Sequence, residues 1–494
     1  MRLDDGTLLA ILNVAGRPWE LESEDTIAGL HFRLNTLHRN LADPRVSFGA
    51  HLCKVAETGV PQAGPCSSFY ARQLDEDYRT QVLGRDLTHN HLFVSLLIEP
   101  NAPFGKRARR LSSGFRRRRR FTTDRSLREV EDLIQTAENG LALYGVQRFG
   151  IRRKGHLRFS EIAEALHVIL YGHYMPMPIP ADGRIGNILY NMRAVFGPIG
   201  SRIFEVRRPG RRYFGTLFGF SEYPAGTEPG LLNTLLSFPT PFVLTQVFSY
   251  SSKAKATATM ELKGRQMTVA GDKAASQIAE LDDAADRLHR NEYVMGDHHL
   301  SLAIYADTVD ELDEIAAKAR LRLADEAGAV VVQEDWGLQE IWWGQLPGNW
   351  KHRPRAGGIK STNYAALAPL HNYPTGEREG FWGEALATFR TNGGTRYDLT
   401  SHVADVGSLL MIGPTGSGKT TLLLFLLAMA ERLGATVVFF DKDQGGRVLV
   451  EAVCGSYLTL WAGEDSGLAP LKALADTPGN RAFLKELIAG LILS

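Results

Sequence analysis

Residues 407–443 have the sequence GSLLMIGPTGSGKTTLLLFLLAMAERLGATVVFFDKD. The apolar run at 408–412 predicts a buried strand, and residues 421–433 predict a helix that ends before Gly434. A second apolar run at 437–440 predicts another buried strand. Strand, loop, helix and strand in this order indicate an α/β domain.

The loop between the first strand and the helix fits the pattern G-x-x-x-x-G-K-[ST] over residues 413–420. Its glycines let the backbone turn its N–H groups inward, and the free amides at the start of the helix favour an anion. Lys419 can then reach the β- and γ-phosphates of a nucleotide as the catalytic residue, and the Thr420 hydroxyl can act as the ligand of Mg²⁺.

A chance glycine-rich turn is the alternative to this phosphate site, and the flanking strand and helix signals argue against it. The predicted cofactor-binding residues are Gly413, Pro414, Thr415, Gly416, Ser417, Gly418, Lys419, Thr420 and Thr421.

The composition of the 494 residues is that of a globular protein, with 44% apolar and 22% charged residues. The net charge of +1 gives no overall field that favours nucleic acid or a membrane. The N-terminus shows no secretory-signal pattern and no run approaches about 18 apolar residues, so we expect any membrane association to be peripheral. Cys53, Cys66 and Cys454 suit a reducing compartment, and Cys454 is expected to be buried.

Residues 1–350 mix strand and helix signals and predict an α+β fold without a catalytic constellation. We predict two α+β regions, 1–180 and 181–350, then a connecting segment at 351–406 and a partial nucleotide-binding domain at 407–494. The expected helices are 24–41, 69–83, 126–144, 156–175, 229–238, 270–290 and 309–324, with Ser126 and Thr308 as N-caps. The expected strands are 8–14, 46–55, 91–99, 242–250, 300–306 and 329–333.

Two polar segments leave alternatives open. Residues 106–120, KRARRLSSGFRRRRR, contain one lysine and eight arginines. They predict a solvated loop or a contact with the phosphates of nucleic acid or lipid, and the scarcity of interleaved aromatic residues favours the loop. Asp297, His298 and His299 carry metal-ligating groups, but neighbours in a strand point to opposite faces, so we expect structural polar residues.

Further segments make the chain resemble the CagE/TrbE/VirB family of ATPases, which power conjugal transfer and type IV secretion. The resemblance runs through AGDKAASQIAELDDA at 270–284, VMGDHHLSL at 294–302, QLPGNWKHRPR at 345–355 and LAPLHNYPTGEREG at 367–380. It continues through the phosphate loop and FFDKDQGG at 439–446, and it includes LYGVQRFGI at 143–151 and FGFSEYPAGTEPGLLNTLLSFP at 218–239. These segments cover nearly the whole chain and are specific in combination.

The resemblance implies a RecA-like P-loop NTPase domain that binds ATP with Mg²⁺, preceded by an N-terminal region that contacts other subunits of the secretion channel. It implies hexameric assembly and a cytoplasmic position, peripheral on the inner membrane of a bacterium. Hydrolysis of ATP would drive channel assembly or substrate transport. DNA is a further expected partner only if the basic run at 106–120 contacts it.

The chain departs from the family pattern after the phosphate loop. A complete P-loop ATPase has a later strand ending in Asp-Glu, whose carboxylates hold Mg²⁺ and orient water. Asp441 lies only 22 residues after Lys419, so Asp441 and Asp443 have either a catalytic polar role or a structural one at the strand end. We therefore expect a chain truncated at its C-terminus, with an abrupt start, weak nucleotide binding and very slow hydrolysis.

Three other functions compete with this one. A non-catalytic fragment would dock on channel subunits through its N-terminal region. A DNA-translocating RecA-like motor would depend on the basic run. A transporter ATPase of the ABC type needs an LSGGQ-like signature after the phosphate loop, whereas LSSGF at 111–115 lies far upstream.

Overall fold

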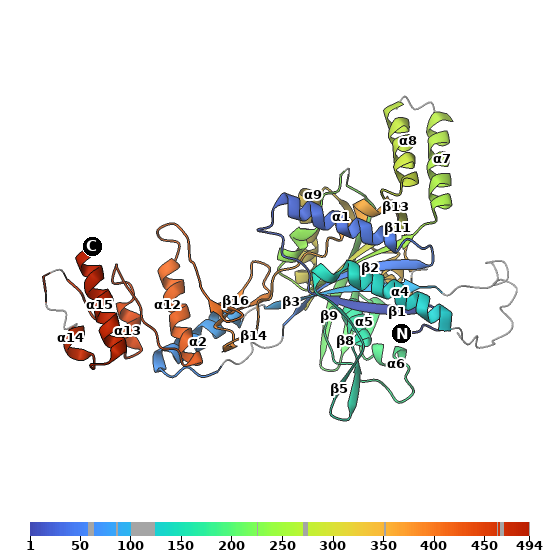
Figure 1. Ribbon diagram of the computed structural model, residues 1–494. Helices are drawn as coiled ribbons and strands as arrows, with labels where there is room; N and C mark the ends of the chain where they lie inside the picture. The colour runs from blue at the N-terminus through green and yellow to red at the C-terminus, as the bar shows by residue number, and fades with distance from the viewer. Residues whose placement is uncertain are drawn as a thin grey trace. The chain divides into compact units, whose positions relative to one another are not determined.

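The computed structural model describes residues 1–57, 64–84, 87–99, 124–224, 226–269, 275–349, 352–461, 463–464 and 469–493 (Figure 1). The chain forms two compact units. Unit 1 contains Met1–Pro61, Thr80–Glu377 and Thr388–Leu399, and unit 2 contains Gln62–Arg79, Arg378–Ala387 and Thr400–Ser494. Each unit therefore combines segments that are far apart in the sequence. The basic run at 106–120 lies outside the described residues.

Unit 1 is built on an 11-stranded sheet whose paired strands are antiparallel. Nine strands follow the order β4-β1-β3-β2-β10-β11-β9-β8-β7, while β12 pairs with β9 and β13 with β11. The six strands expected from the sequence are confirmed within a few residues. The bounds are β1 (Leu8–Val14), β2 (Val46–Ala56), β3 (Thr88–Ile98), β4 (Val146–Arg148), β7 (Arg193–Gly197), β8 (Gly200–Arg208), β9 (Arg211–Glu222), β10 (Phe242–Tyr250), β11 (Met295–Ala306), β12 (Val330–Gln333) and β13 (Gly357–Lys360).

Apolar side chains cover both faces of this sheet, as the two-residue period of a strand requires. In β10, Phe242, Leu244 and Phe248 belong to clusters on one face, and Val243 belongs to the cluster on the other. The first face packs against α1 (Glu24–Asn40), α4 (Asp124–Gly140), α9 (Val309–Ala327) and α11 (Ser361–Leu367). The second face packs against α5 (Glu161–Tyr171) and α10 (Leu338–Gly344).

Helix ends in unit 1 show where local sequence decides structure. Thr308 accepts a hydrogen bond from the Glu311 N–H at 3.3 Å, which confirms it as the N-cap of α9. The cap predicted at Ser126 is wrong, because α4 already begins at Asp124. Helix α5 is shorter than the helix predicted over 156–175. The exposed hairpin of β5 (Ile151–Lys154) and β6 (Leu157–Ser160) occupies the residues just before it.

Two helices, α7 (Lys253–Val269) and α8 (Ala275–His289), stand side by side beyond the sheet of unit 1 (Figure 1). The sequence predicts α8 but not α7, because the apolar residues of α7 are too few to form a continuous stripe. The short helix expected at 229–238 is a 3₁₀ turn, Asn233–Ser237.

Unit 2 contains α2 (Phe69–Tyr78), α12 (Lys419–Met429), α13 (Arg447–Ala452), α14 (Pro470–Ala473) and α15 (Pro478–Leu493). It also contains the short hairpins β14 (Glu379–Gly380) with β15 (Gly383–Glu384) and β18 (His402–Val403) with β19 (Val406–Gly407). The hairpin of β16 (Ala387–Arg390) and β17 (Arg396–Leu399) lies mostly in unit 1. The helix predicted at 421–433 is confirmed as α12 and the 3₁₀ turn Ala430–Leu433.

The two buried strands predicted beside the phosphate loop are wrong. Residues 408–412 and 437–440 form no strand, and the exposed fractions of Leu410, Ile412 and Phe440 are 81%, 86% and 93%. An apolar run becomes a buried strand only where neighbouring strands pair with its backbone and cover its side chains. No described segment of unit 2 supplies such strands.

The structure places three residues that the sequence singled out, namely Cys454, His298 and His299. Cys454 is exposed in the turn after α13, so the prediction of a buried thiol is wrong. His298 and His299 are buried in β11, and a 2.8 Å hydrogen bond joins His298 Nδ1 to the Tyr223 hydroxyl. The described residues contain no group of three or more His, Cys, Asp or Glu that could hold a metal ion. Across the same residues, no helix is both long and apolar enough to cross a bilayer.

Candidate nucleotide-binding site

The phosphate loop of unit 2 depends on glycine at two positions. Gly416 and Gly418 have φ angles of +82° and +87°, the left-handed region that side-chain-bearing residues seldom occupy. A Cβ at either position would meet no heavy atom within 4 Å, so the space beside the loop is open. Gly418 is the N-cap of α12, which therefore begins at Lys419 with its free amides next to the loop.

Lys419 turns back onto the loop that precedes it. Its Nζ donates hydrogen bonds to the carbonyl oxygens of Gly413 at 2.6 Å and Pro414 at 2.7 Å. The ammonium group therefore lies at the mouth of the loop, where a polyphosphate chain would compete with these carbonyls for it.

A turn at 441–446 lies next to Thr420. A Cβ built on Gly445 would be 3.2 Å from Thr420 Cγ2. Asp441 Oδ2 accepts hydrogen bonds from the Gly446 N–H at 2.7 Å and from the Tyr457 hydroxyl at 3.3 Å. Asp441 thus has a structural role in this turn, and Gly445 of the same turn lies beside Thr420, the predicted Mg²⁺ ligand. Asp443 is exposed in the same turn.

Helix α12 is held by α2, a segment about 350 residues earlier in the chain. The ring of Tyr78 lies 4.7 Å from that of Phe425, and Arg432 forms a 2.7 Å ion pair with Asp75. Glu431 makes a further contact between these segments. Its carboxylate accepts hydrogen bonds from the N–H and the hydroxyl of Ser68, each at 2.8 Å. These residues could not be predicted from the sequence, because no local pattern signals a contact across so many residues.

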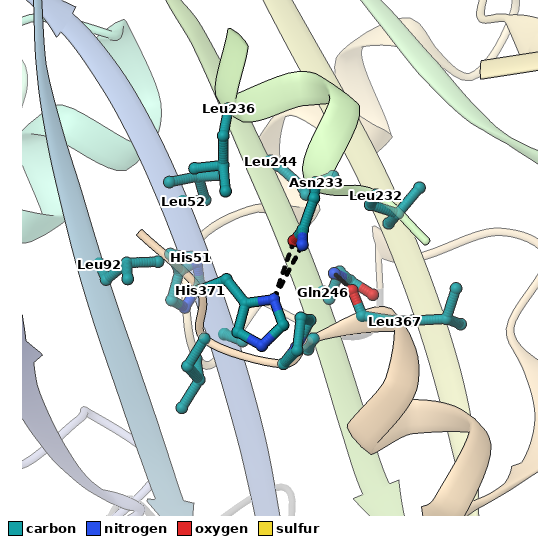
Figure 2. A pocket seen from close by; sticks show the side chains of 14 residues that line it. His51, Leu52, Leu92, Leu232, Asn233, Leu236, Leu244, Gln246, Leu367 and His371 are labelled. Carbon is teal, nitrogen blue, oxygen red and sulfur yellow. Dashed lines mark hydrogen bonds between the residues drawn. The ribbon is translucent and has the colours of Figure 1, made fainter. Parts of the chain in front are cut away.

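Two cavities in unit 1 do not fit a nucleotide. The first measures about 40 Å³, and Figure 2 shows leucine side chains around it and His371 hydrogen-bonded to Asn233. This volume holds little more than a water molecule or two. The second cavity, about 300 Å³, is lined by Glu161, Glu164 and Arg152, and the guanidinium of Arg152 already forms a 2.9 Å ion pair with Glu164. This lining does not favour a triphosphate.

The electrostatic surroundings of the phosphate loop differ from those of these cavities. Lys419 is the cation at the loop, and Thr420 and Thr421 are exposed at the start of the helix. The backbone from Gly413 to Thr420, one ammonium group and one hydroxyl are the parts that a Mg²⁺–nucleotide complex requires for its phosphates. These residues therefore fit the magnesium complex of a nucleoside triphosphate.

Two family models match separate parts of the chain between residues 1 and 355. Residues 1–105 match "Type IV secretion system ATPase VirB4/TrbE, N-terminal domain". Residues 147–355 match "CagE, TrbE, VirB family, component of type IV transporter system". The chain belongs to the VirB4/TrbE family.

Relatives of this family align over almost the whole chain, including the phosphate loop. Protein virB4 of Rhizobium radiobacter is 44% identical over 498 residues, which cover 100% of this chain and 62% of the relative. Type IV secretion system protein virB4 of Bartonella henselae is 39% identical, covering 99% of this chain and 62% of the relative. Type IV secretion system protein PtlC of Bordetella pertussis is 30% identical, and the match covers 98% of this chain and 60% of the relative. The chain is thus a homologue of VirB4 and PtlC and spans about three fifths of their length.

Proposed function

We propose that this VirB4/TrbE chain binds ATP with Mg²⁺ through residues 413–421 and acts as an energising subunit of a type IV secretion system. The observation that carries the proposal is the phosphate loop at the start of α12, with Lys419 at its mouth and Thr420 beside it. Backbone amides and Lys419 hold the phosphates, and Thr420 ligates the metal. Hydrolysis then drives channel assembly or substrate transport.

The proposed domain around this site is RecA-like. Residues 408–412 and 437–440 are apolar and exposed, as strands are when their neighbours are missing. In the relatives, the aligned part occupies about three fifths of the length. We assign to the remaining length the strands that cover these two segments and the Asp-Glu pair that orients the attacking water.

The proposed partners follow from the family. Unit 1 contacts other channel subunits, six copies assemble around the nucleotide sites, and the protein lies on the cytoplasmic side of the inner membrane. Opening of the subunit interface after loss of the γ-phosphate transmits the energy of hydrolysis to the channel.

Substrate transfer by the secretion system tests this function directly. Lys419→Gln and Lys442→Gln are each introduced into the gene in the bacterium that carries it. Lys442 is an exposed lysine close to the same site, so it is a matched control. We expect Lys419→Gln to abolish transfer at normal protein level and Lys442→Gln to preserve it. Normal transfer with Lys419→Gln would overturn the proposal.

Hydrolysis by the 494-residue chain gives a second test. Residues 441–494 contain no Asp-Glu pair, so we expect very slow turnover that does not depend on Lys419. A protein extended to the length of the relatives should hydrolyse ATP in a Lys419-dependent way. Rapid, Lys419-dependent turnover by the 494-residue chain would show that its own carboxylates suffice.

A further inference from the structure

The cavity of about 300 Å³ in unit 1 lies between the sheet and helix α5. β1 ends opposite Leu92, so His89 and His91 of β3 lie beyond its last residue. Both histidines line the cavity, and both point to the same sheet face as Phe93, which packs against α5. This volume is at the lower end of the range for small-molecule sites, so the cavity can hold one group the size of a side chain.

The first turns of α5 supply two carboxylates to the cavity. Glu161, Glu164 and Ala165 lie on one face of the helix, because they are three and four residues apart. The buried Glu164 forms an ion pair with Arg152 at 2.9 Å. Glu161 forms no ion pair with any described residue, and its Oε2 accepts a hydrogen bond from the Gly150 N–H at 2.8 Å. One carboxylate is therefore neutralised and the other is not.

Arg152 shows how this part of the molecule binds a guanidinium group. Besides pairing with Glu164, its guanidinium contacts the hydroxyl of Tyr174 at 3.4 Å and lies over the ring of Phe159 at 5.5 Å. A carboxylate, a hydroxyl and an aromatic face are the partners that a planar guanidinium prefers. The lining around Glu161 offers the same kinds of group without a cation.

The other polar groups of the lining have acceptors to offer. Within the described part of the chain, the side chains of His89, His91 and Asn13 form no hydrogen bond. Burial lowers the pKa of both imidazoles, that of His91 to about 3, so each is neutral at physiological pH and presents one acceptor nitrogen. The ring of His91 is stacked on those of Phe93 and Tyr174, at 5.5 and 6.0 Å.

The lining has a net negative charge, since it contains one arginine and two glutamates beside neutral imidazoles. Arg396, a further cation near His89, is itself paired with Asp398 at 2.7 Å. An anion or an apolar ligand would leave Glu161 and the imidazoles unpaired, whereas a cation with several N–H donors would satisfy them. The planar fork of a guanidinium suits several acceptors and aromatic rings better than the point charge of an ammonium group does.

The cavity is open to a ligand from outside. Tyr174 is 41% exposed, and the side chain of Arg152 is 44% exposed. We call the cavity the arginine pocket, and the residues that define it are Asn13, His89, His91, Phe149, Glu161 and Tyr174.

We infer that the arginine pocket binds the guanidinium group of an arginine side chain that belongs to another protein. Glu161 pairs with the guanidinium, and the imidazoles and Asn13 accept its remaining N–H donors. The rings of Phe149 and Tyr174 offer it aromatic faces. The choice of a protein as the source rests on the proposed contact between unit 1 and other channel subunits, whereas the chemistry of the pocket does not.

Binding of small arginine derivatives to the full chain tests the inference. Nα-acetylarginine amide carries the guanidinium group, and Nα-acetylcitrulline amide has almost the same shape without the charge. Saturation-transfer NMR measures the dissociation constant of each compound. We expect a Kd on the order of 1 mM for the arginine derivative. The citrulline derivative should bind at least about tenfold more weakly, since it cannot form the charge-assisted bonds.

Glu161→Gln and Glu24→Gln form a matched pair of variants. Each glutamate is the first helical residue after a serine N-cap, in α5 and in α1. Both variants therefore lose the same charge next to a helix N-terminus. Only Glu161→Gln should weaken binding of the arginine derivative, by about tenfold. His91→Phe keeps an aromatic ring, removes the nitrogens and should weaken binding about threefold. The thermal unfolding midpoint of each variant checks that it folds.

Equal binding of the arginine and citrulline derivatives would overturn the inference, and so would equal binding by the two glutamate variants. Agmatine, a free alkylguanidine, distinguishes the two sources of a guanidinium group. If it bound more than about 100-fold more tightly than the arginine derivative, the pocket would serve a small molecule and the protein source would be wrong.

ATP binding by the natural chain and by Lys419→Ala, measured in parallel, separates this inference from the proposed function. If ATP binding depends on Lys419 while the arginine derivative does not bind, the arginine pocket alone is wrong. If the arginine derivative binds in a Glu161-dependent way while ATP binding does not depend on Lys419, the pocket stands and the nucleotide site is wrong.

Discussion

Lys419 Nζ lies 2.6 Å from the carbonyl oxygen of Gly413, the first residue of its own phosphate loop. The ammonium group is thus already positioned where the phosphates are expected, and its hydrogen bonds to backbone carbonyls take the place of those to an anion. A nucleotide must exchange these bonds for charge-assisted bonds to phosphate oxygens, which are roughly twice as strong as neutral ones.

Gly418 should be more sensitive to substitution than its local contacts suggest. Gly418→Ala places a side chain at φ +87°, which costs roughly 1–2 kcal/mol and reorients the amides at the start of α12. Gly434→Ala imposes similar strain at φ +64° after the 3₁₀ turn. We expect both variants to lose similar stability, but only Gly418→Ala to lose ATP affinity, by about tenfold. Equal affinities in calorimetry would contradict the role of the loop.

Thr420 should matter only when Mg²⁺ is present. Thr420→Val keeps the shape of the side chain and removes the hydroxyl that we propose as a ligand of the metal. The affinity for ATP should fall at least about tenfold in Mg²⁺ and stay unchanged in a metal chelator. Thr436→Val, at an exposed threonine of the same unit, serves as the control. A loss that is equal with and without Mg²⁺ would indicate a purely structural role for Thr420.

Local sequence patterns predicted the parts of this fold that local forces decide. The cap at Thr308, the period-two strands and the helix after the phosphate loop, predicted from Thr421 and observed from Lys419, are all set by residues within one or two turns. The pairing of α2 with α12 could not be predicted, because Asp75 and Arg432 meet across more than 350 residues. The strand predictions for 408–412 and 437–440 were wrong for the same reason. Whether an apolar run becomes a buried strand depends on the strands that pair with it.

We expect the stability of unit 1 to depend on pH through the buried Lys54. Its buried Nζ donates to the carbonyl oxygens of Leu236 at 2.8 Å, Phe238 at 2.7 Å and Gly393 at 2.6 Å. Burial, with Arg390 and Arg322 nearby, lowers the pKa of Lys54 to about 7. Between this pKa and the ordinary value near 10.4 the unfolded chain binds more protons, so this group adds stability as pH rises from about 7 to 10.

The variant Lys54→Met isolates this contribution. It leaves three buried carbonyls without a donor, so it should destabilise the protein by about 3 kcal/mol at neutral pH. The difference in free energy of unfolding between the natural chain and the variant should widen by up to about 1.4 kcal/mol per pH unit above 7. Denaturant unfolding at several pH values measures this difference in free energy of unfolding. A difference that stays constant from pH 7 to 10 would contradict the lowered pKa of Lys54.

We expect the protein to lose folding stability in acid because several of its histidines are buried. Burial lowers the pKa of His38, His51 and His298 to about 3 each. Between pH 6.5 and 3 the unfolded chain binds protons that the folded protein excludes, so stability falls as the pH falls, by up to about 1.4 kcal/mol per pH unit for each histidine. His51→Asn should reduce this slope by about one histidine's share in unfolding curves. An unchanged slope would show that His51 protonates in the folded state.

Binding of ATP with Mg²⁺ to the 494-residue chain, measured by isothermal titration calorimetry, tests the central claim most directly. Lys419→Ala is compared with Lys442→Ala, whose side chain is exposed in the nearby 441–446 turn. A lost charge-assisted hydrogen bond is worth about 1.5–3 kcal/mol, so Lys419→Ala should weaken ATP binding about 10- to 100-fold. Lys442→Ala should bind as the natural chain does. If Lys419→Ala also binds ATP with unchanged affinity, residues 413–421 do not hold the phosphates.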